Sequence, residues 1–342
     1  MSATRDVQGQ LLAFAWDQWA QMGVLAEPSR RDAWVMDPEA LLVLTLSVGR
    51  ADPRLFDEVL DWLWTNGRLI SVQRLRNLSR VDETLERTAN AALDWVSTSG
   101  GGIKLPPRGP KPQPAREQPL FVVDGRPLRV TSPDPSFGRY GLLRSDVVRT
   151  GRSRPPDPSI PINLAFRLRL LFGVGSRAEC IRCLLTDLRR ELSVADAAEI
   201  AGYAKRNVAD ALAALTSAGV VAERTHRNGL RYRLEQRRWS EFLDLDLDAL
   251  DPHPNWPALL RALAGIHRWT ATTPNDVSDQ MRASRARDLI ERIGPDLSAA
   301  GVALPPAGRP GAAYLDGFWH CVDDALALLK PPIAPAVRAA RS

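Results

Sequence analysis

The amino-acid sequence predicts a mainly α-helical protein with a short β-structured segment near its middle. Apolar side chains recur every three or four residues before residue 98 and again after residue 254, which is the spacing of amphipathic helices. Between residues 220 and 234 the apolar spacing changes to two, which is typical of a strand that is buried on one face. The 342 residues and the apolar fraction of 44% allow two or three domains with sizeable cores.

Residues 1–98 are expected to form an N-terminal helical domain. The dipeptides Asp37-Pro38 and Asp52-Pro53 each place an aspartate directly before a proline. Aspartate suits the position before the first helical turn, because its carboxylate accepts hydrogen bonds from free backbone N–H groups. Proline suits the first helical position. Two helices are therefore expected to begin at these dipeptides.

Residues 99–160 are expected to be a basic connector rich in proline and glycine. Twelve of the 27 prolines lie between residues 98 and 160, so no long helix is expected there. A β-hairpin is possible at residues 120–130, because Asp124-Gly125 is a favoured two-residue turn.

The central part of the chain contains the signals of three successive helices. Ser176 and Ser193 each precede an acidic residue by three positions, which is the spacing of a capping box at a helix start. Gly202 is expected to end the second helix, and a third helix is expected from Tyr203 to a left-handed cap at Gly219. The second and third helices are thus joined by a tight turn that contains glycine.

A β-hairpin is expected directly after the third helix. Residues 220–225 suit its first strand, and residues 227–229, Arg-Asn-Gly, suit its turn. In the second strand Leu230, Tyr232 and Leu234 alternate with two arginines. Neighbouring side chains of a strand point to opposite faces, so the apolar set is expected in the core and the arginines outside.

Residues 193–221, SVADAAEIAGYAKRNVADALAALTSAGVV, resemble winged-helix repressors of the ArsR/MarR type. The shared features are the short AAEIA helix, the turn, the polar start of the next helix, and the exit through Ala-Gly-Val-Val. This resemblance implies that residues 161–240 form a winged helix-turn-helix DNA-binding domain. The expected fold is therefore mainly α, with this domain flanked by the N-terminal helical domain and by a C-terminal helical domain at residues 241–342. No cluster of metal ligands of the ArsR type is visible, so metal sensing is not implied.

The candidate DNA contacts lie at the start of the third helix and on the hairpin. A helix in the major groove brings its N-terminal residues closest to the base edges. Arg206 and Asn207 are the candidates for reading bases, since arginine pairs with guanine and asparagine with adenine through two hydrogen bonds. The basic residues Lys205, Arg227, Arg231 and Arg233 are expected to contact phosphate or the minor groove. The full set is Tyr203, Lys205, Arg206, Asn207, Arg227, Asn228, Arg231 and Arg233.

Two alternative interpretations of these basic residues stay open. A solvated helix face, or an edge strand that is protected against aggregation, contains the same types of basic residue. Arg149, Arg152 and Arg154, just before the central domain, suit either a minor-groove arm or a solvated linker.

The charge along the chain is uneven. Residues 101–160 contain 11 basic and 5 acidic residues, and residues 161–240 contain 14 and 8, so each of these segments has a net charge of +6. Residues 1–100 contain 10 and 14, a net charge of −4, and residues 241–342 contain 10 and 13, a net charge of −3. A basic middle between acidic ends favours a polyanionic partner for the middle.

Several other classes of function have no support in the sequence. No apolar run is long enough for a membrane span, and the N-terminus is not of the secretory type. Cys180 and Cys183 lie within an expected amphipathic helix and have no second cysteine pair, which favours buried thiols over a zinc or redox site. No metal, no cofactor and no enzymatic activity are expected.

The sequence therefore predicts a cytoplasmic, sequence-specific regulator of transcription that binds double-stranded DNA, acts as a repressor, and forms a homodimer. The alternative is a protein-interaction adaptor, for example an antitoxin-like protein, that uses the winged helix to dock a protein partner.

Overall fold

Helices predominate and the strands are short, as the sequence predicts. The computed structural model describes residues 6–28, 33–105, 117–187, 191–226, 229–274, 276–308 and 311–330. In the N-terminal part the elements are α1 (Val7–Gln21), α2 (Pro38–Val48), α3 (Pro53–Asn66), the 3-10 turn η1 (Gly67–Leu69), α4 (Val72–Ser79) and α5 (Glu83–Thr98). Asp37 and Asp52 cap α2 and α3 with prolines in the first turn, which confirms both predicted helix starts.

The segment after α5 is partly folded and packs on the N-terminal helices. Its elements are β1 (Gln118–Pro119), β2 (Val122–Val123), β3 (Arg126–Pro127), α6 (Pro135–Gly138) and β4 (Leu142–Leu143). The hairpin expected around Asp124-Gly125 forms, since β2 and β3 pair antiparallel and both turn residues have positive φ. Leu120, Phe137 and Leu142 are buried, so this part of the connector contributes to the core.

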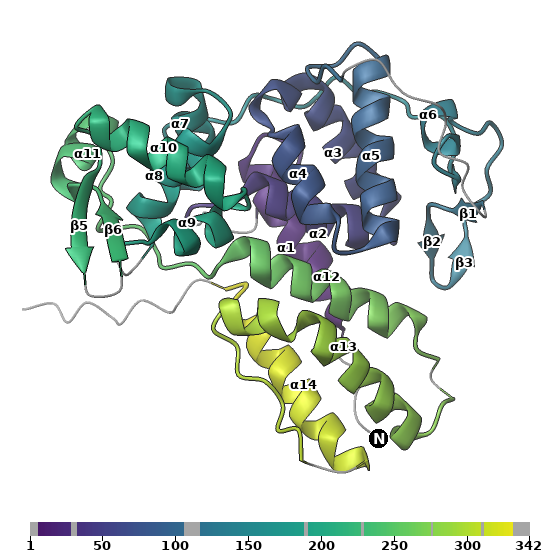
Figure 1. Cartoon of the computed structure of the whole chain (residues 1–342). Coiled ribbons are helices and arrows are strands. Elements are labelled where there is room, and N and C mark those ends of the chain that lie inside the picture. Colours follow the sequence, from purple (N-terminus) through teal and green to yellow (C-terminus); the bar gives the residue numbers. More distant parts are fainter. Residues whose placement is uncertain are drawn as a thin grey trace, which may run out of the picture.

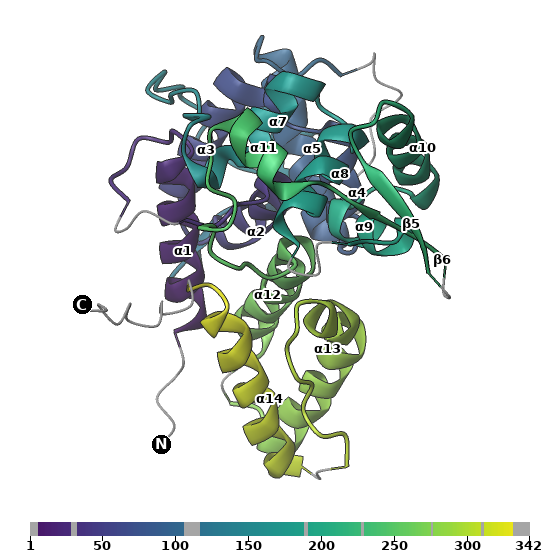
Figure 2. The ribbon, with the colours of Figure 1, turned by 90° about the vertical axis from the view of Figure 1, so that its left-hand side faces the viewer.

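The central segment contains η2 (Pro161–Asn163), α7 (Leu164–Phe172), α8 (Ser176–Thr186), α9 (Val194–Ala201), α10 (Lys205–Ser217), β5 (Ala222–His226), β6 (Gly229–Arg233) and α11 (Gln236–Leu243). Most of its buried apolar residues, together with Val35, form a second hydrophobic core, whereas Ile162 and Phe166 pack in the core of the N-terminal helices. Figures 1 and 2 show the hairpin β5–β6 projecting from this segment, away from the N-terminal helices.

The C-terminal part contains α12 (Trp256–Thr272), α13 (Asp279–Ala299) and α14 (Gly311–Ala327). The sequence places the two flanking helical parts in separate domains, but their buried side chains form one continuous core. The reason is α2, in which ten of eleven residues are buried. A helix that is apolar on all sides needs cover on all sides, and α4, α5 and α12 pack around it.

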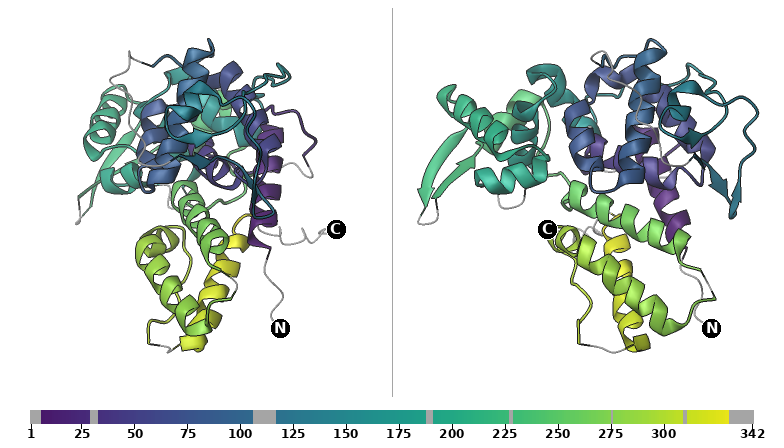
Figure 3. Two further views of the ribbon diagram at one scale, coloured as in Figure 1. Left: turned by 90° about the vertical axis from the view of Figure 1, so that its right-hand side faces the viewer. Right: turned by 45° about the vertical axis from the view of Figure 1, so that its right-hand side comes forward.

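Trp256 at the start of α12 anchors this shared core. Its indole N–H donates a hydrogen bond to the carbonyl oxygen of Val35 over 2.9 Å, and its ring meets that of Trp34 edge to face. Figure 3 shows α12 lying between the N-terminal helices and the pair α13–α14. None of the helices in the described ranges has the length and apolar composition that crossing a bilayer requires.

Candidate nucleic-acid interface

The turn between α9 and α10 sets the direction of α10. Ser193 and Asp196 form the expected capping box at the start of α9. Gly202 ends α9 with φ of +66°, a left-handed conformation that glycine adopts without strain. Helix α10 then begins at Lys205, two residues later than predicted, and no side chain caps its first turn. The first backbone N–H groups of α10 therefore have no side-chain partner from the cap position and can donate to another group.

Two of the residues predicted to contact DNA lie in solvent at this open end of α10. Lys205 and Arg206 are exposed, and Asn207 is half-buried. Neither of the two cations forms an ion pair with any of the residues that the structure describes. Val208, Leu212 and Leu215 are buried on the opposite face of α10, so the exposed face is fixed by the packing of the helix.

The β5–β6 hairpin lies beside α9. Tyr232 of β6 exchanges two backbone hydrogen bonds with Leu192, at 3.0 and 2.9 Å, so Leu192, just before the cap of α9, forms an isolated antiparallel bridge to the hairpin. Tyr232 and Leu234 are buried as predicted, but Leu230 is 44% exposed because it lies near the tip, where no other element covers it.

The two predicted arginines of β6 differ in their surroundings. Arg233 is exposed, whereas Arg231 is half-buried and its guanidinium contacts the carboxylate of Asp196 over 2.6 Å. Arg231 thus links the hairpin to the cap of α9. Arg224 of β5, which sequence reasoning did not single out, is also exposed and lies 3.8 Å from Glu191. Arg227 and Asn228 lie outside the described residues.

Tyr203 does not belong with the exposed candidates. It is buried, and its hydroxyl oxygen lies 2.7 Å from that of Ser71, the residue that caps α4. Burial raises the pKa of Tyr203 above its usual value. The neighbouring Gly202 lies against Leu78 and Arg74 of α4, so the turn before α10 is packed on the N-terminal helices. The assignment of Tyr203 as a DNA contact is corrected accordingly.

Six charged side chains are buried where the central segment meets the N-terminal helices, and we call them the buried ionic cluster. Each is at most 3% exposed. Three are acidic and three are basic, and they come from the start of α2 and from α4, α7 and α8. The members are Asp37, Glu39, Arg74, Arg169, Glu179 and Arg182.

Arginines bridge the carboxylates of this cluster. Arg169 contacts both oxygens of Glu39, at 2.7 and 2.6 Å, and reaches Glu179 at 2.6 Å. Arg74 joins Asp37 at 2.6 Å to Glu39 at 2.7 Å, and Arg182 lies 2.8 Å from Glu179. Arg74 also donates to the backbone carbonyl of Ala201 at the end of α9. The cluster therefore holds α7, α8 and the α9–α10 turn to α2 and α4.

The cluster explains why one predicted helix cap is wrong. Ser176 and Glu179 were expected to form a capping box, but α8 begins after Gly175 without a side-chain cap. Glu179 instead binds Arg169 and Arg182. Burial alone would raise the pKa of Glu179, but the guanidinium groups of Arg182, Arg169 and Arg74 outweigh it and hold that pKa well below its usual value. Bonds to two buried cations are worth more than one exposed cap.

The three arginines proposed as a possible minor-groove arm lie along α3. Arg149 stacks its guanidinium on the ring of Trp64, 3.6 Å from the ring centre. The carboxylate of Asp61 accepts backbone N–H bonds from Thr150, Gly151 and Ser153. Arg154 pairs through its backbone with Gly23. In this structure the segment is held on the N-terminal helices, away from α10.

Cys180 and Cys183 are both buried in α8. Burial raises the pKa of Cys183 to about 12 and raises that of Cys180 as well, so neither thiol is reactive at neutral pH. Within the described part of the chain, no three His, Cys, Asp or Glu side chains gather into a group that could hold a metal ion.

Comparison with known proteins adds no relative, since no family model, no curated protein and no solved structure matches the chain.

Proposed function

We propose that the central segment is a winged helix-turn-helix that binds double-stranded DNA sequence-specifically, and that the protein is a transcriptional regulator acting as a repressor. One observation carries the proposal. The open N-terminal end of α10 presents Lys205, Arg206 and Asn207, and the hairpin that follows α10 presents Arg233. The antiparallel bridge between Leu192 and Tyr232 of the hairpin also suits a wing. A cytoplasmic location belongs to the same proposal.

The mechanism follows from the chemistry of these side chains. Helix α10 enters the major groove, where Arg206 pairs with a guanine and Asn207 with an adenine. Lys205 and the free N–H groups at the start of α10 neutralise phosphate charge. Arg233 contacts the backbone or the minor groove next to it. Arg231, because it is bound to Asp196, serves to orient the hairpin.

The proposal is tested by fluorescence anisotropy of the purified protein with the duplex upstream of its own gene and with a scrambled duplex, at several salt concentrations. The expected result is that the upstream duplex binds about a thousandfold more tightly near physiological salt. Equal binding of both duplexes, with an affinity that collapses as salt rises, would show only non-specific attraction to phosphate and would contradict the proposal.

A homodimer is part of the proposal, because two half-sites on a palindromic operator match a twofold protein. An exposed apolar patch suits the contact between subunits. It consists of Leu170 and Leu171 of α7, which are 58% and 50% exposed, and Phe242 of α11, which is 59% exposed. Replacing Leu171 by Arg is expected to convert a dimer to a monomer in light scattering.

The same patch favours a second candidate function, a protein-interaction adaptor. Large apolar side chains that are gathered in solvent mark contact surfaces. If the protein is monomeric, binds both duplexes alike, and co-purifies with a partner only when Leu171 is intact, the adaptor function replaces the first proposal.

A further inference from the structure

Two adjoining cavities lie between the N-terminal helices and the C-terminal helices, far along the chain from α10. The smaller, of about 140 Å³, lies among α12, α13 and the start of α5. The larger, of about 470 Å³, lies among α2, α5, α12 and the β2–β3 hairpin. Ser47, Asp82, Leu85 and Arg268 line both, so the cavities meet at these residues.

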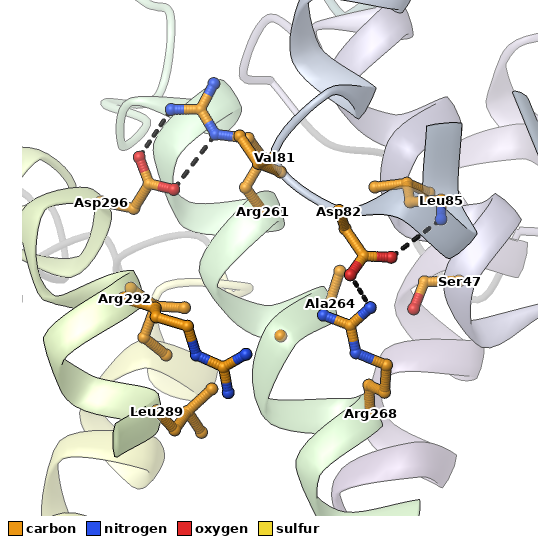
Figure 4. A pocket seen from close by; sticks show the side chains of 12 residues that line it. Ser47, Val81, Asp82, Leu85, Arg261, Ala264, Arg268, Leu289, Arg292 and Asp296 are labelled. Atoms are coloured by element: carbon orange, nitrogen blue, oxygen red, sulfur yellow. Dashed lines mark hydrogen bonds and ion pairs between the residues drawn. The ribbon is translucent and has the colours of Figure 1, made fainter. Parts of the chain in front are cut away.

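Some of the charges in the cavities neutralise one another. Figure 4 shows the smaller cavity, with Arg261 bound to Asp296 and Arg268 bound to Asp82. The guanidinium of Arg261 reaches the two oxygens of Asp296 at 2.6 and 3.1 Å. Asp82 also accepts the backbone N–H of Leu85, since it caps α5. Both oxygens of each of these two carboxylates therefore already have an N–H donor within the protein.

Two further arginines have no such neutralisation. Arg50 is half-buried, and it donates to the carbonyl oxygens of Leu120 and Pro119 at 2.9 and 3.1 Å. Arg292 donates to the carbonyl oxygen of Asp288, and its guanidinium points into the smaller cavity. Carbonyl oxygens satisfy N–H donors without cancelling the charge. Among the described residues, neither arginine forms an ion pair with a carboxylate.

The positive charges around the cavities repel one another, and burial together with this repulsion lowers the pKa of two arginines. Burial lowers the pKa of Arg50, and the charges of Arg87 and Arg268 lower it further. Burial and the charge of Arg292 do the same for Arg268. The one other carboxylate that lines the cavities, Asp124, is exposed at the tip of the β2–β3 hairpin. An anion placed between these guanidinium groups would relieve their mutual repulsion.

The larger cavity adds apolar walls from Leu46, Leu85, Val122 and Ala271. A pocket with apolar walls and a few convergent polar groups is the usual form of a small-molecule site. Its volume lies within the range of such sites, and the smaller cavity has room for a single anionic group.

We propose that the two cavities bind a small organic anion, with its phosphate or carboxylate group on Arg292, next to the Arg268–Asp82 ion pair, and its organic body in the larger cavity. Arginine suits both groups, because its planar guanidinium matches two oxygens at once. The site is independent of the proposed DNA binding, since none of its residues belongs to the central segment.

Titration calorimetry with three probes of similar size tests the proposal. Phenyl phosphate and benzoate carry an anionic group on the same apolar ring, and benzyl alcohol carries none. We expect at least one of the two anions to bind at least about tenfold more tightly than benzyl alcohol. The stronger of the two identifies the natural head group as phosphate or carboxylate. Equal binding of all three probes, or no binding of either anion at millimolar concentration, would overturn the proposal.

A matched pair of variants locates the binding. Arg292→Gln removes an exposed guanidinium that holds only a backbone carbonyl, so the fold is expected to survive. It should weaken binding of the preferred anion by about tenfold. Arg285→Gln removes another exposed arginine of α13 that does not line either cavity, and it should leave the affinity unchanged. Equal affinities of the two variants would place the anion elsewhere and contradict the assignment.

Discussion

The arginines of the buried ionic cluster have surroundings opposite to those of the exposed arginines of α10 and of the β5–β6 hairpin. Arg169 is surrounded by Glu39 and Glu179, and almost none of its surface reaches solvent. Arg206 and Arg233 are exposed and have no carboxylate partner in the described structure. The first kind holds two parts of the chain together, and the second kind is free to meet a polyanion. Partner and burial, rather than residue type, separate the two roles.

The comparison also changes what the charge count means. The central segment contributes two arginines and one carboxylate to the cluster, and the N-terminal part contributes two carboxylates and one arginine. One unit of the basic excess at residues 161–240 and one unit of the acidic excess at residues 1–100 therefore meet inside the protein. The remaining basic excess of the central segment is what can act on a partner.

The largest expected effect comes from removing one arginine of the buried ionic cluster. Arg169→Gln leaves Glu39 and Glu179 with fewer cations in a dry environment. Removing one partner of a buried ion pair usually lowers the free energy of unfolding by about 3–5 kcal/mol. Urea denaturation measures this change.

The matched control is Arg177→Gln, which removes an exposed arginine of α8 and should change the free energy of unfolding by less than about 0.5 kcal/mol. Similar losses in the two variants would mean that the cluster does not hold the two parts together.

A buried cation without a carboxylate partner should lower the free energy of unfolding, and His267 of α12 tests this expectation. Burial lowers its pKa to about 4, and the charge of Arg50 contributes. The unfolded chain, with a histidine pKa of about 6.5, binds the proton first as the pH falls. The contribution of neutral His267 to the free energy of unfolding is therefore fully present above pH 6.5. It is lost as the pH falls from 6.5 to 4, and the total loss is about 3 kcal/mol.

Denaturation curves of His267→Gln across this pH range check the expectation, since the variant should show a shallower loss. His320→Gln, at an exposed position of α14, is the control and should keep the slope of the unaltered protein. An unchanged slope in His267→Gln would assign the titration to another group, such as His253, whose pKa burial also lowers to about 4.

The smallest expected effect concerns Tyr203, which lies between the two regions. Tyr203→Phe removes the hydrogen bond to Ser71 and leaves the ring in place. It should lower the free energy of unfolding by about 1 kcal/mol and leave DNA affinity unchanged. A clear loss of DNA affinity at unchanged stability would return Tyr203 to the DNA-contacting set.

Local signals in the sequence predicted what local interactions determine. The caps at Asp37 and Ser193 and the turn at Gly202 each depend on residues within a few positions, and all three form. The errors arise where a distant partner competes. Glu179 meets Glu39 through Arg169, which is 130 residues from Glu39 along the chain. Tyr203 meets Ser71 across 132 residues.

The connector was misjudged for a similar reason. Its prolines exclude long helices, as predicted, but they do not prevent packing on a neighbouring surface. Phe137 and Phe121 pack on Phe56 of α3, and Arg144 binds Asp57 of α3 over 2.6 Å. No spacing within residues 99–160 indicates these contacts, because their partners lie in another part of the sequence.

The most direct test of the proposed division between the two regions is the DNA affinity of Arg206→Ala/Asn207→Ala, measured by anisotropy on the upstream and scrambled duplexes. Each bidentate base contact is worth about 1–3 kcal/mol of discrimination. The proposal predicts that the variant loses about that much affinity, or more, for the upstream duplex, while the scrambled duplex binds almost as before and the melting temperature is unchanged. Unaltered affinity for the upstream duplex in a folded variant would contradict base reading by α10.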